Sequence, residues 1–287
     1  MTAIKLDGEL LATEVKNDLR ERIGALTTKG ITPGLGTILV GDDGPSKNYV
    51  AMKHRDCQDL GMNSKEITLP ATTEQNDISE AVQAFNQDPE IHAFIIQYPF
   101  PKGLDYETEL MNVLPHKDAD GLHPVNLGKL VQGIPAPLAC TPAGIQMLLT
   151  RFEVPIEGKH IVVVGRGLTI GRPLANLLSL KRPNANAVVT VVHTGAGDIS
   201  PYTRQADILI AAAGSPGMIT ADMVKPGAAV VAAGVSFSEK KLVSDVTDEV
   251  NTVAGWLSPR IGGVGPMTRA LLMANTVSAA EKSKNAL

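Results

Sequence analysis

Aromatic residues, cysteines and basic runs are all scarce in this chain of 287 residues, and the scarcity of cysteines and of basic runs argues against particular classes of site and partner. Only 3% of the residues are aromatic, and 26 lysines and arginines face 30 acidic residues, for a net charge of −4. Because nucleic-acid-binding surfaces are basic, we expect no nucleic-acid partner. The two cysteines, Cys57 and Cys140, form no Cys-x-x-Cys pair, so neither a disulfide framework nor a metal site is predicted.

Long apolar runs are also missing. No run approaches the roughly 18 residues that a membrane span needs, and the first residues lack the apolar core of a signal peptide. We therefore expect a cytoplasmic protein with no membrane partner. The length predicts about two domains, each large enough to bury its own core.

Short apolar runs alternate with helical patterns along the chain. These runs are 36–40, 93–96, 161–164, 188–192, 208–212 and 228–233. The alternation is typical of parallel sheets covered by helices, so an α/β fold is predicted. Prolines cluster between Pro115 and Pro142 and predict a domain boundary there. Helical patterns open the chain at 8–29 and close it at 266–284, and the closing helix is expected to return to the first domain.

A hydroxyl, an aromatic ring and an amine recur along the helix predicted after the strand 36–40. Asp43 is the expected cap of this helix. Ser46, Tyr49 and Lys53 then lie at i, i+3 and i+7, on one stripe at the carboxyl end of a strand, where open α/β sheets bind ligands. The plainer interpretation is a tyrosine at the margin of the core beside a lysine whose ammonium reaches solvent.

A glycine-rich segment follows the strand 161–164 and precedes a helical pattern. Its spacing is G-x-G-x-x-x-G, and the residues expected to meet a cofactor are Gly165, Arg166, Gly167, Thr169, Ile170 and Gly171. Glycines let the backbone approach a pyrophosphate, and the following helix turns its free N–H groups toward it. A purely structural turn is the alternative, but the flanking strand and helix favour the phosphate-binding interpretation.

The end of the next strand, 188–192, distinguishes between two cofactors. NAD sites place Asp or Glu there to bind the ribose 2′-hydroxyl, but this chain continues with His193 and Thr194. Arg166 could instead pair with a 2′-phosphate through its planar guanidinium, with a hydrogen bond from Thr194. We therefore predict NADP rather than NAD.

Further polar candidates lie in loop-like segments. Gln97 follows the strand 93–96, and Asp120 precedes a glycine. Alone, Gln97 is either a ligand contact or an ordinary strand-end residue, and Asp120 is either a binding carboxylate or part of an Asx turn. Together with Lys53 and Tyr49, they offer an amine, an amide and a carboxylate beside an aromatic ring, which suits a flat heterocycle with adjacent N–H donors.

In six ordered motifs the chain resembles the bifunctional methylenetetrahydrofolate dehydrogenase/cyclohydrolases, over nearly its whole length. The motifs are 40–53, 97–101, 117–124, 141–142, Gly165-Arg166 with Gly171, and 262–268. The resemblance implies an N-terminal α/β folate domain, residues 1–140 with 270–287, and a Rossmann-type NADP-binding domain, residues 141–269. It also implies a homodimer that oxidises 5,10-methylenetetrahydrofolate with NADP and hydrolyses the methenyl product to 10-formyltetrahydrofolate, in one-carbon metabolism.

The resemblance also implies roles for single residues. Lys53 matches the catalytic lysine, which assists proton movement around the attacking water and so needs a depressed pKa. Gln97 matches the residue that positions this lysine, and Tyr49 the one that stacks on the aminobenzoyl ring. Asp120 matches the acid that binds the pterin, whose two parallel N–H donors suit one carboxylate. The remaining folate contacts are expected from Ser46, Gly262, Gly263 and Pro266.

The chain departs from the family pattern at several positions. Gly167 replaces the usual serine of the glycine loop and removes one hydroxyl near the cofactor phosphates, while Tyr98 and Phe100 replace leucines. Two alternatives stay open. One is another two-domain NADP-dependent dehydrogenase, of shikimate type, acting on a small hydroxy acid. The other is a non-catalytic NADP-binding sensor.

Overall fold

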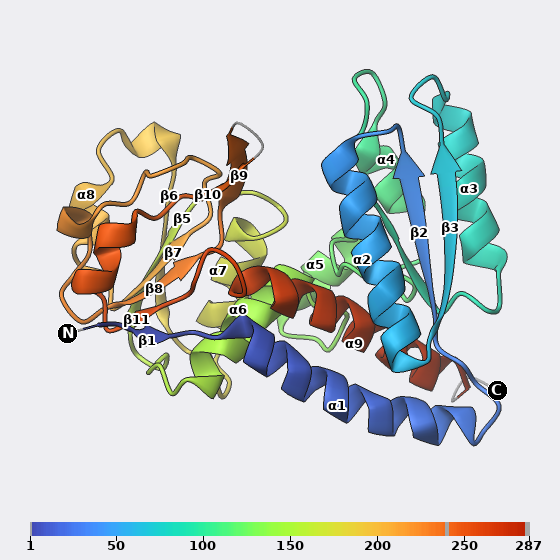
Figure 1. Ribbon diagram of the computed structural model, residues 1–287, viewed down its shortest axis with the longest axis horizontal. Coiled ribbons are helices and arrows are strands. Elements are labelled where there is room, and N and C mark those ends of the chain that lie inside the picture. Colours follow the sequence, from blue (N-terminus) through green and yellow to red (C-terminus); the bar gives the residue numbers. More distant parts are fainter. Residues whose placement is uncertain (1, 239–240, 285–287) are drawn as a thin grey trace. The chain divides into compact units, whose positions relative to one another are not determined.

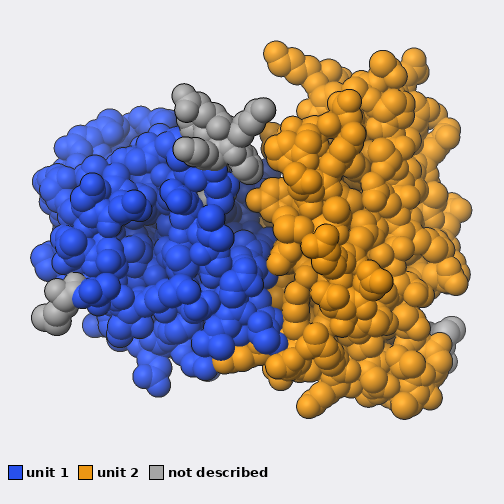
Figure 2. All heavy atoms as spheres, in the orientation of Figure 1, with its two compact units in different colours: residues 1–13, 130–134, 139–268 blue, residues 14–129, 135–138, 269–287 orange. Residues whose placement is uncertain are grey.

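The computed structural model describes residues 2–238 and 241–284, and the chain divides into two compact units (Figure 1; Figure 2). Unit 1 comprises residues 1–13, 130–134 and 139–268, and unit 2 comprises residues 14–129, 135–138 and 269–287. The division falls inside three helices, α1 (Gly8–Thr27), α5 (Pro124–Gln132) and α9 (Val264–Lys284).

Residues 1–13 cluster with unit 1, although the sequence-based boundary places them in the folate domain. The reason is a pair of two-residue strands, β1 (Ile4–Lys5) and β11 (Trp256–Leu257), which run parallel with Ile4 opposite Trp256. Strands this short carry no periodic signal in the sequence, so only the three-dimensional pairing reveals them.

A three-stranded parallel sheet forms the centre of unit 2, in the order β3-β2-β4. Its strands are β2 (Gly34–Val40), β3 (Asn63–Leu69) and β4 (Ala93–Ile96), and its further helices are α2 (Gly44–Leu60), α3 (Gln75–Gln87) and α4 (Tyr106–Asn112). Strands β2 and β4 are buried throughout, which explains their unbroken apolar sequences. Phe85 of α3 packs on Phe94 of β4, with ring centroids 5.5 Å apart.

The sequence did not predict strand β3. Its residues read Asn-Ser-Lys-Glu-Ile-Thr-Leu, of which three are half-buried and four are exposed. An edge strand with one solvated face needs few apolar residues, so it lacks the continuous run that marks β2 and β4.

The C-terminal helix returns to unit 2, as predicted. Residues of α9 from 269 onward belong to this unit, and Met273 is fully buried there. Arg22 of α1 donates to Glu281 at 2.7 Å, and Asn275 Nδ2 donates to the Ala119 carbonyl oxygen at 2.9 Å. These contacts join α9 both to α1 and to the segment that carries Asp120.

Unit 1 is built on a six-stranded parallel sheet in the order β1-β11-β8-β7-β5-β6. Besides β1 and β11, the strands of this sheet are β5 (His160–Val164), β6 (Val188–Val192), β7 (Ile208–Ala211) and β8 (Ala229–Ala232). The α-helices of the unit include α6 (Cys140–Arg151), α7 (Gly171–Ser179) and α8 (Ser200–Thr203). Strands β9 (Val235–Ser238) and β10 (Lys241–Ser244) form a separate antiparallel hairpin. The predicted α/β fold with parallel sheets is confirmed. Strand β5 has β6 on one side and β7 on the other, which creates the topological switch point where such sheets bind ligands.

Both cysteines are buried thiols, and neither is part of a disulfide in the described residues. Burial raises the pKa of the Cys57 thiol to about 12, so it stays protonated and inert at neutral pH. Across residues 2–238 and 241–284, every helix is too short or too polar to cross a membrane.

Candidate active site

Helix α2 begins with the cap that the sequence predicts. The Asp43 carboxylate accepts hydrogen bonds from the Ser46 backbone N–H at 2.9 Å and from the Ser46 hydroxyl at 2.7 Å. Ser46 is only 3% exposed, so its hydroxyl proton is committed to this cap. Its expected contact with folate stays a prediction.

Lys53 of α2 and Gln97 meet at the carboxyl end of the unit 2 sheet. Lys53 Nζ donates to Gln97 Oε1 at 2.8 Å. Gln97 Nε2 donates to the Tyr98 carbonyl oxygen at 2.7 Å, and the Gln97 N–H donates to the Ile38 carbonyl at 2.8 Å. These two bonds fix the backbone N–H and the side-chain Nε2 of Gln97, and the side-chain oxygen faces the lysine. The amine is thus held in place, although 44 positions separate the two residues in the chain.

Asp120 lies close to this pair. Burial raises the pKa of the Asp120 carboxyl, the Lys53 charge lowers it, and Asp118 raises it further. The influence of Lys53 shows that the amine and the carboxylate share one electrostatic environment. Unit 2 therefore brings Lys53, Gln97 and Asp120 together, and a cluster of titratable groups with a shifted pKa marks a candidate functional site.

Asp118 supports the loop that carries Asp120, a role that the sequence did not reveal. Its carboxylate accepts hydrogen bonds from the Gly121 N–H at 2.9 Å, the His123 N–H at 2.8 Å and Asn126 Nδ2 at 2.9 Å. The turn considered for Asp120 is thus made by Asp118. The two acids stand two residues apart, and sequence spacing alone does not say which one binds the backbone.

Aromatic rings line the same end of unit 2. Tyr49 of α2 is 38% exposed, so its ring is available for stacking. Tyr98 is 62% exposed and packs edge-on against Tyr106, with ring centroids 5.4 Å apart. Phe100 also packs edge-on against Tyr106, with centroids 5.3 Å apart. The two aromatic residues that replace family leucines therefore build one cluster beside Gln97.

The loop with Gly262, Gly263 and Pro266 belongs to unit 1, at the start of α9. The Gly262 carbonyl accepts the N–H of Gly8 at 2.8 Å, and Gly262 has a positive φ of 79°. A Cβ at Gly263 would lie 2.3 Å from the Pro259 carbonyl oxygen, so only glycine fits this turn. The folate contacts expected from this loop stay predictions.

The glycine loop of unit 1 joins β5 to α7 at the switch point. A Cβ at Gly165 would lie 2.2 Å from the Ala212 carbonyl oxygen, and a Cβ at Gly171 would lie 2.3 Å from the Gly165 carbonyl oxygen. Gly167 differs, because the nearest atom to its ideal Cβ is Thr169 Oγ1 at 4.0 Å. The loop is therefore closely packed at both ends and open at its middle, where its backbone can approach a phosphate.

Alanine substitutions should separate these two kinds of glycine. We expect Gly171→Ala to lower the free energy of unfolding by about 1–3 kcal/mol and to abolish NADP binding, because the new methyl overlaps backbone atoms that have no room to move. Gly167→Ala, the matched control, should change the melting temperature and NADP affinity little. Thermal unfolding and NADP titration measure both. Equal loss in the two variants would contradict the structural distinction.

The ends of β5 and β6 lie next to each other, since the Gly165 N–H donates to the Val192 carbonyl at 2.8 Å. Arg166 and Thr194, which follow these strands, are exposed, and Arg166 has neither ion pair nor side-chain hydrogen bond within the described part of the chain. His193 Nδ1 accepts the Gly195 N–H at 3.0 Å, which leaves its Nε2 as a donor. The ends of β5 and β6 offer a cation and hydrogen-bond donors, and no acidic residue directly follows β6, so this arrangement fits a 2′-phosphate.

A further acid shapes the same edge of unit 1 and was missed by sequence reasoning. The Asp245 carboxylate, 1% exposed, accepts the N–H groups of Ala213 at 2.8 Å and Gly214 at 2.9 Å. It thereby fixes the turn after β7. Asp245 and the turn at Ala213–Gly214 are about 30 residues apart in the chain, with the β9–β10 hairpin between them. No local sequence pattern therefore predicts this contact.

Comparison with known proteins agrees with this geometry. Residues 6–120 match the model of the tetrahydrofolate dehydrogenase/cyclohydrolase catalytic domain, and residues 139–284 match that of its NAD(P)-binding domain. The bifunctional protein FolD of Syntrophotalea carbinolica is 54% identical over 282 residues, which cover 98% of this chain and 97% of that protein.

Solved structures give the same result. The bifunctional FolD methylenetetrahydrofolate dehydrogenase/cyclohydrolase of Campylobacter jejuni superposes with a TM-score of 0.94 at 38% identity, covering 98% of this chain and 99% of that one. The Trypanosoma brucei dehydrogenase-cyclohydrolase, solved with NADP and an inhibitor, gives 0.93 at 34% identity, with 99% of each chain covered. The chain therefore belongs to the tetrahydrofolate dehydrogenase/cyclohydrolase family.

Proposed function

We propose that this chain oxidises 5,10-methylenetetrahydrofolate to 5,10-methenyltetrahydrofolate with NADP and then hydrolyses the product to 10-formyltetrahydrofolate. The observation that carries the proposal is the Lys53–Gln97 pair beside Asp120 in unit 2, in a chain of this family. A shikimate-type dehydrogenase and a non-catalytic sensor are both disfavoured by the family match over nearly the whole chain.

Unit 1 is the cofactor half in this proposal. The 165–171 loop would hold the pyrophosphate, Arg166 and Thr194 would bind the 2′-phosphate, and His193 would contact the ribose. NADP, when bound, accepts a hydride from the substrate's methylene carbon. The support from this chain's own residues is the open backbone at Gly167 and the exposed Arg166 guanidinium, which forms no ion pair with any described residue, together with the lack of an acidic residue directly after β6.

Unit 2 is the folate half. Asp120 accepts the adjacent N–H donors of the pterin, and the exposed ring of Tyr49 stacks on the aminobenzoyl group. Lys53, oriented by Gln97, takes a proton from the water that adds to the methenyl carbon. Opening of the ring then places one proton on the released ring nitrogen, so the cation plus water gives neutral formyl-folate and one free proton.

An absorbance assay with two signals tests the proposal. Purified protein is supplied with methylenetetrahydrofolate and NADP, and reduced nicotinamide and methenyl-folate are followed separately. Reduced cofactor without methenyl accumulation is the expected result, because both reactions then run in sequence. If methenyltetrahydrofolate accumulates as fast as the cofactor is reduced, the chain has no cyclohydrolase activity. If neither NADP nor NAD is reduced, the folate assignment is wrong.

Cofactor choice is tested by Arg166→Ala. Loss of a charged hydrogen-bonding pair of about 1.5–3 kcal/mol should lower kcat/KM for NADP by roughly 10-fold to 150-fold while leaving NAD nearly unchanged. Steady-state kinetics with both cofactors measure the ratio. Arg182→Ala, which removes an exposed charge beyond the end of α7, is the matched control. An equal loss with NAD would contradict a contact with the 2′-phosphate.

The two compact units are proposed to act as the folate and NADP domains. The homodimer and the cytoplasmic location expected from the family resemblance also stay proposals. Sedimentation velocity tests the first, since a monomer at micromolar concentration would contradict it, and subcellular fractionation tests the second.

A further inference from the structure

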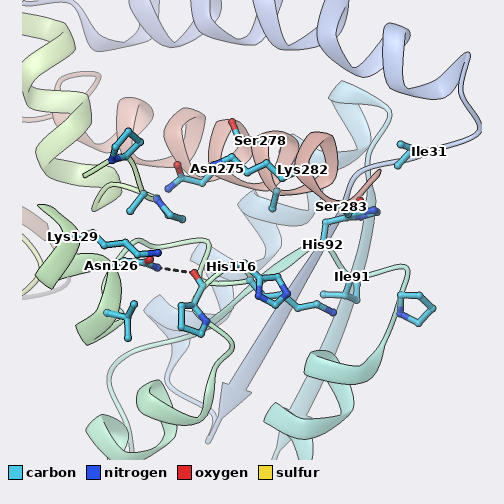
Figure 3. A pocket seen from close by; sticks show the side chains of 18 residues that line it. Ile31, Ile91, His92, His116, Asn126, Lys129, Asn275, Ser278, Lys282 and Ser283 are labelled. Carbon is cyan, nitrogen blue, oxygen red and sulfur yellow. Dashed lines mark hydrogen bonds between the residues drawn. The ribbon is translucent and has the colours of Figure 1, made fainter. Parts of the chain in front are cut away.

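A large basic pocket lies in unit 2, away from the residues discussed above (Figure 3). Its volume is about 1060 Å³, at the upper end of the range for small-molecule sites. Ile31 lies just before β2, and Ile91 and His92 lie just before β4, so the pocket opens at the amino end of the parallel strands. Lys53 and Gln97 are at the carboxyl end. The two sites therefore occupy opposite edges of one sheet.

The pocket combines apolar walls with basic and hydrogen-bonding groups. The apolar lining comes from Ile31, Pro89, Ile91, Pro115, Val125, Pro135, Ala136, Pro137 and Ala279. Three lysines, Lys117, Lys129 and Lys282, and two histidines, His92 and His116, supply the nitrogen groups, and none of the 18 lining residues is acidic. Such a lining repels cations, and its positive groups offset the cost of removing an anion from water.

Lys117 supplies a buried positive charge at this site. It is 9% exposed, and its Nζ donates to the carbonyl oxygens of Phe85 at 2.9 Å and Asp88 at 2.8 Å. The nearest acid to influence it is Asp88, whose carboxylate is engaged by Lys65 at 2.8 Å. Burial accordingly lowers the pKa of Lys117. A buried ammonium held only by carbonyl oxygens is stabilised when an anion joins it.

Further nitrogen groups line the same pocket. His92 Nδ1 accepts the Gly34 N–H at 3.1 Å, so the proton of the neutral ring is on Nε2. Within the described ranges, the ammonium groups of Lys129 and Lys282 form no ion pair or hydrogen bond. Figure 3 shows Lys129 on α5 and Lys282 on α9, pointing from two different walls.

The pocket is linked to Asp120 by short covalent and hydrogen-bonded paths. His116 and Lys117 line the pocket, and the same segment reaches Asp120 three residues later. Asn126, another lining residue, donates to the Pro115 carbonyl at 2.7 Å and to the Asp118 carboxylate at 2.9 Å (Figure 3). A ligand that shifts this wall would therefore act on the loop that presents Asp120.

We propose that this pocket is a second ligand site, that it takes a small organic anion, and that its occupancy changes folate binding through the 116–120 segment. The carboxylate or phosphate of the ligand is held by the basic side chains that line the pocket. Its apolar body lies against Ile91, Val125 and the prolines. Binding of an anion in this pocket does not depend on the proposed function, whereas the effect on folate binding does.

Three probes with one flat body test the site: 1-naphthyl phosphate, 1-naphthoate and the neutral 1-naphthol. Each is titrated calorimetrically into the full chain with saturating NADP, so that the cofactor site is blocked. We expect saturable binding of one or both anions at one site, with 1-naphthol at least 10-fold weaker. If only 1-naphthyl phosphate or only 1-naphthoate binds, the result identifies which anionic group the site prefers. No saturable anion binding, or equal binding of 1-naphthol, would overturn the proposal.

Variants locate the binding. Lys129→Ala/Lys282→Ala should weaken anion binding about 10-fold, because two ammonium groups are lost, and should leave the melting temperature and NADP affinity unchanged. Lys47→Ala/Lys181→Ala removes the same charge from exposed positions elsewhere and is the control. Unchanged binding in the first double variant, or displacement of the probe by folate with a common site, would place the anion outside this pocket.

Kinetics then test the coupling. With the anion present, the KM for methylenetetrahydrofolate should change at least 2-fold in the wild type and not in Lys129→Ala/Lys282→Ala. If the KM is constant while calorimetry shows the site filled, the coupling is wrong and the binding site stands. If no turnover occurs at all, the proposed function has failed independently of the calorimetric result.

Discussion

A Lys53→Met variant is expected to lose the cyclohydrolase, so that methenyltetrahydrofolate accumulates as fast as NADP is reduced. General-base assistance by a positioned group is worth about 10²-fold to 10⁴-fold, and methionine has no group that accepts a proton from water. Methionine keeps the length and apolar character of the side chain, so packing changes little. The two-signal absorbance assay measures the loss directly.

The structure supplies the controls for this variant. NADP affinity should persist, because Lys53 belongs to unit 2 and the glycine loop to unit 1. Lys47→Met makes the same replacement six residues earlier on α2, at an exposed position, and should keep both activities. A Lys53→Met enzyme that hydrolyses methenyl-folate at the wild-type rate would remove Lys53 from the mechanism.

Asp120→Asn is expected to move stability and activity in opposite directions. Burial raises the pKa of Asp120, so at pH 7 the ionised carboxylate destabilises the folded state relative to the unfolded one. The neutral asparagine relieves this penalty, and the melting temperature should rise or stay constant. The pterin, however, loses a carboxylate that accepts two N–H bonds of about 1.5–3 kcal/mol each, so kcat/KM for methylenetetrahydrofolate should fall about 100-fold or more.

The pH dependence provides a second test of Asp120. An acid whose pKa is raised in the folded state binds protons above its usual pKa of about 3.9, and only its ionised form accepts both N–H groups. The KM for methylenetetrahydrofolate should therefore rise as the pH falls through the raised pKa of Asp120, and this rise should be absent in Asp120→Asn. Asp18→Asn, at an exposed position of α1, controls for the change in net charge. A KM that rises equally with acid in all three proteins would place the titrating group elsewhere.

Much of the fold and the identity of the key side chains could be predicted from the sequence. Fully buried strands such as β2 and β5 appear as unbroken apolar runs, since neither face meets water. The cap of α2 by Asp43 and the placement of Lys53 follow from local rules of helix geometry. The missing acid after β6 favoured NADP for a similar reason, because the end of one strand and the residue type suffice for that prediction.

Other features were decided by tertiary structure alone. Strand β3 depends on its place at the sheet edge, and residues 1–13 join unit 1 through a two-residue pairing. The choice between Asp118 and Asp120 for the supporting role depends on which carboxylate meets three donors, and the turn held by Asp245 joins distant segments. The basic pocket draws its walls from α5, α9 and the starts of two strands.

The sequence by itself determined which chemical groups this protein possesses and the local elements that carry them, because capping, periodicity and glycine spacing act over a few residues. Only the tertiary structure decided which groups meet. The contact of Lys53 with Gln97 and the gathering of basic side chains at the far edge of the sheet arise from chain segments brought together by burial of the core, and that burial depends on shape and volume rather than on local spacing.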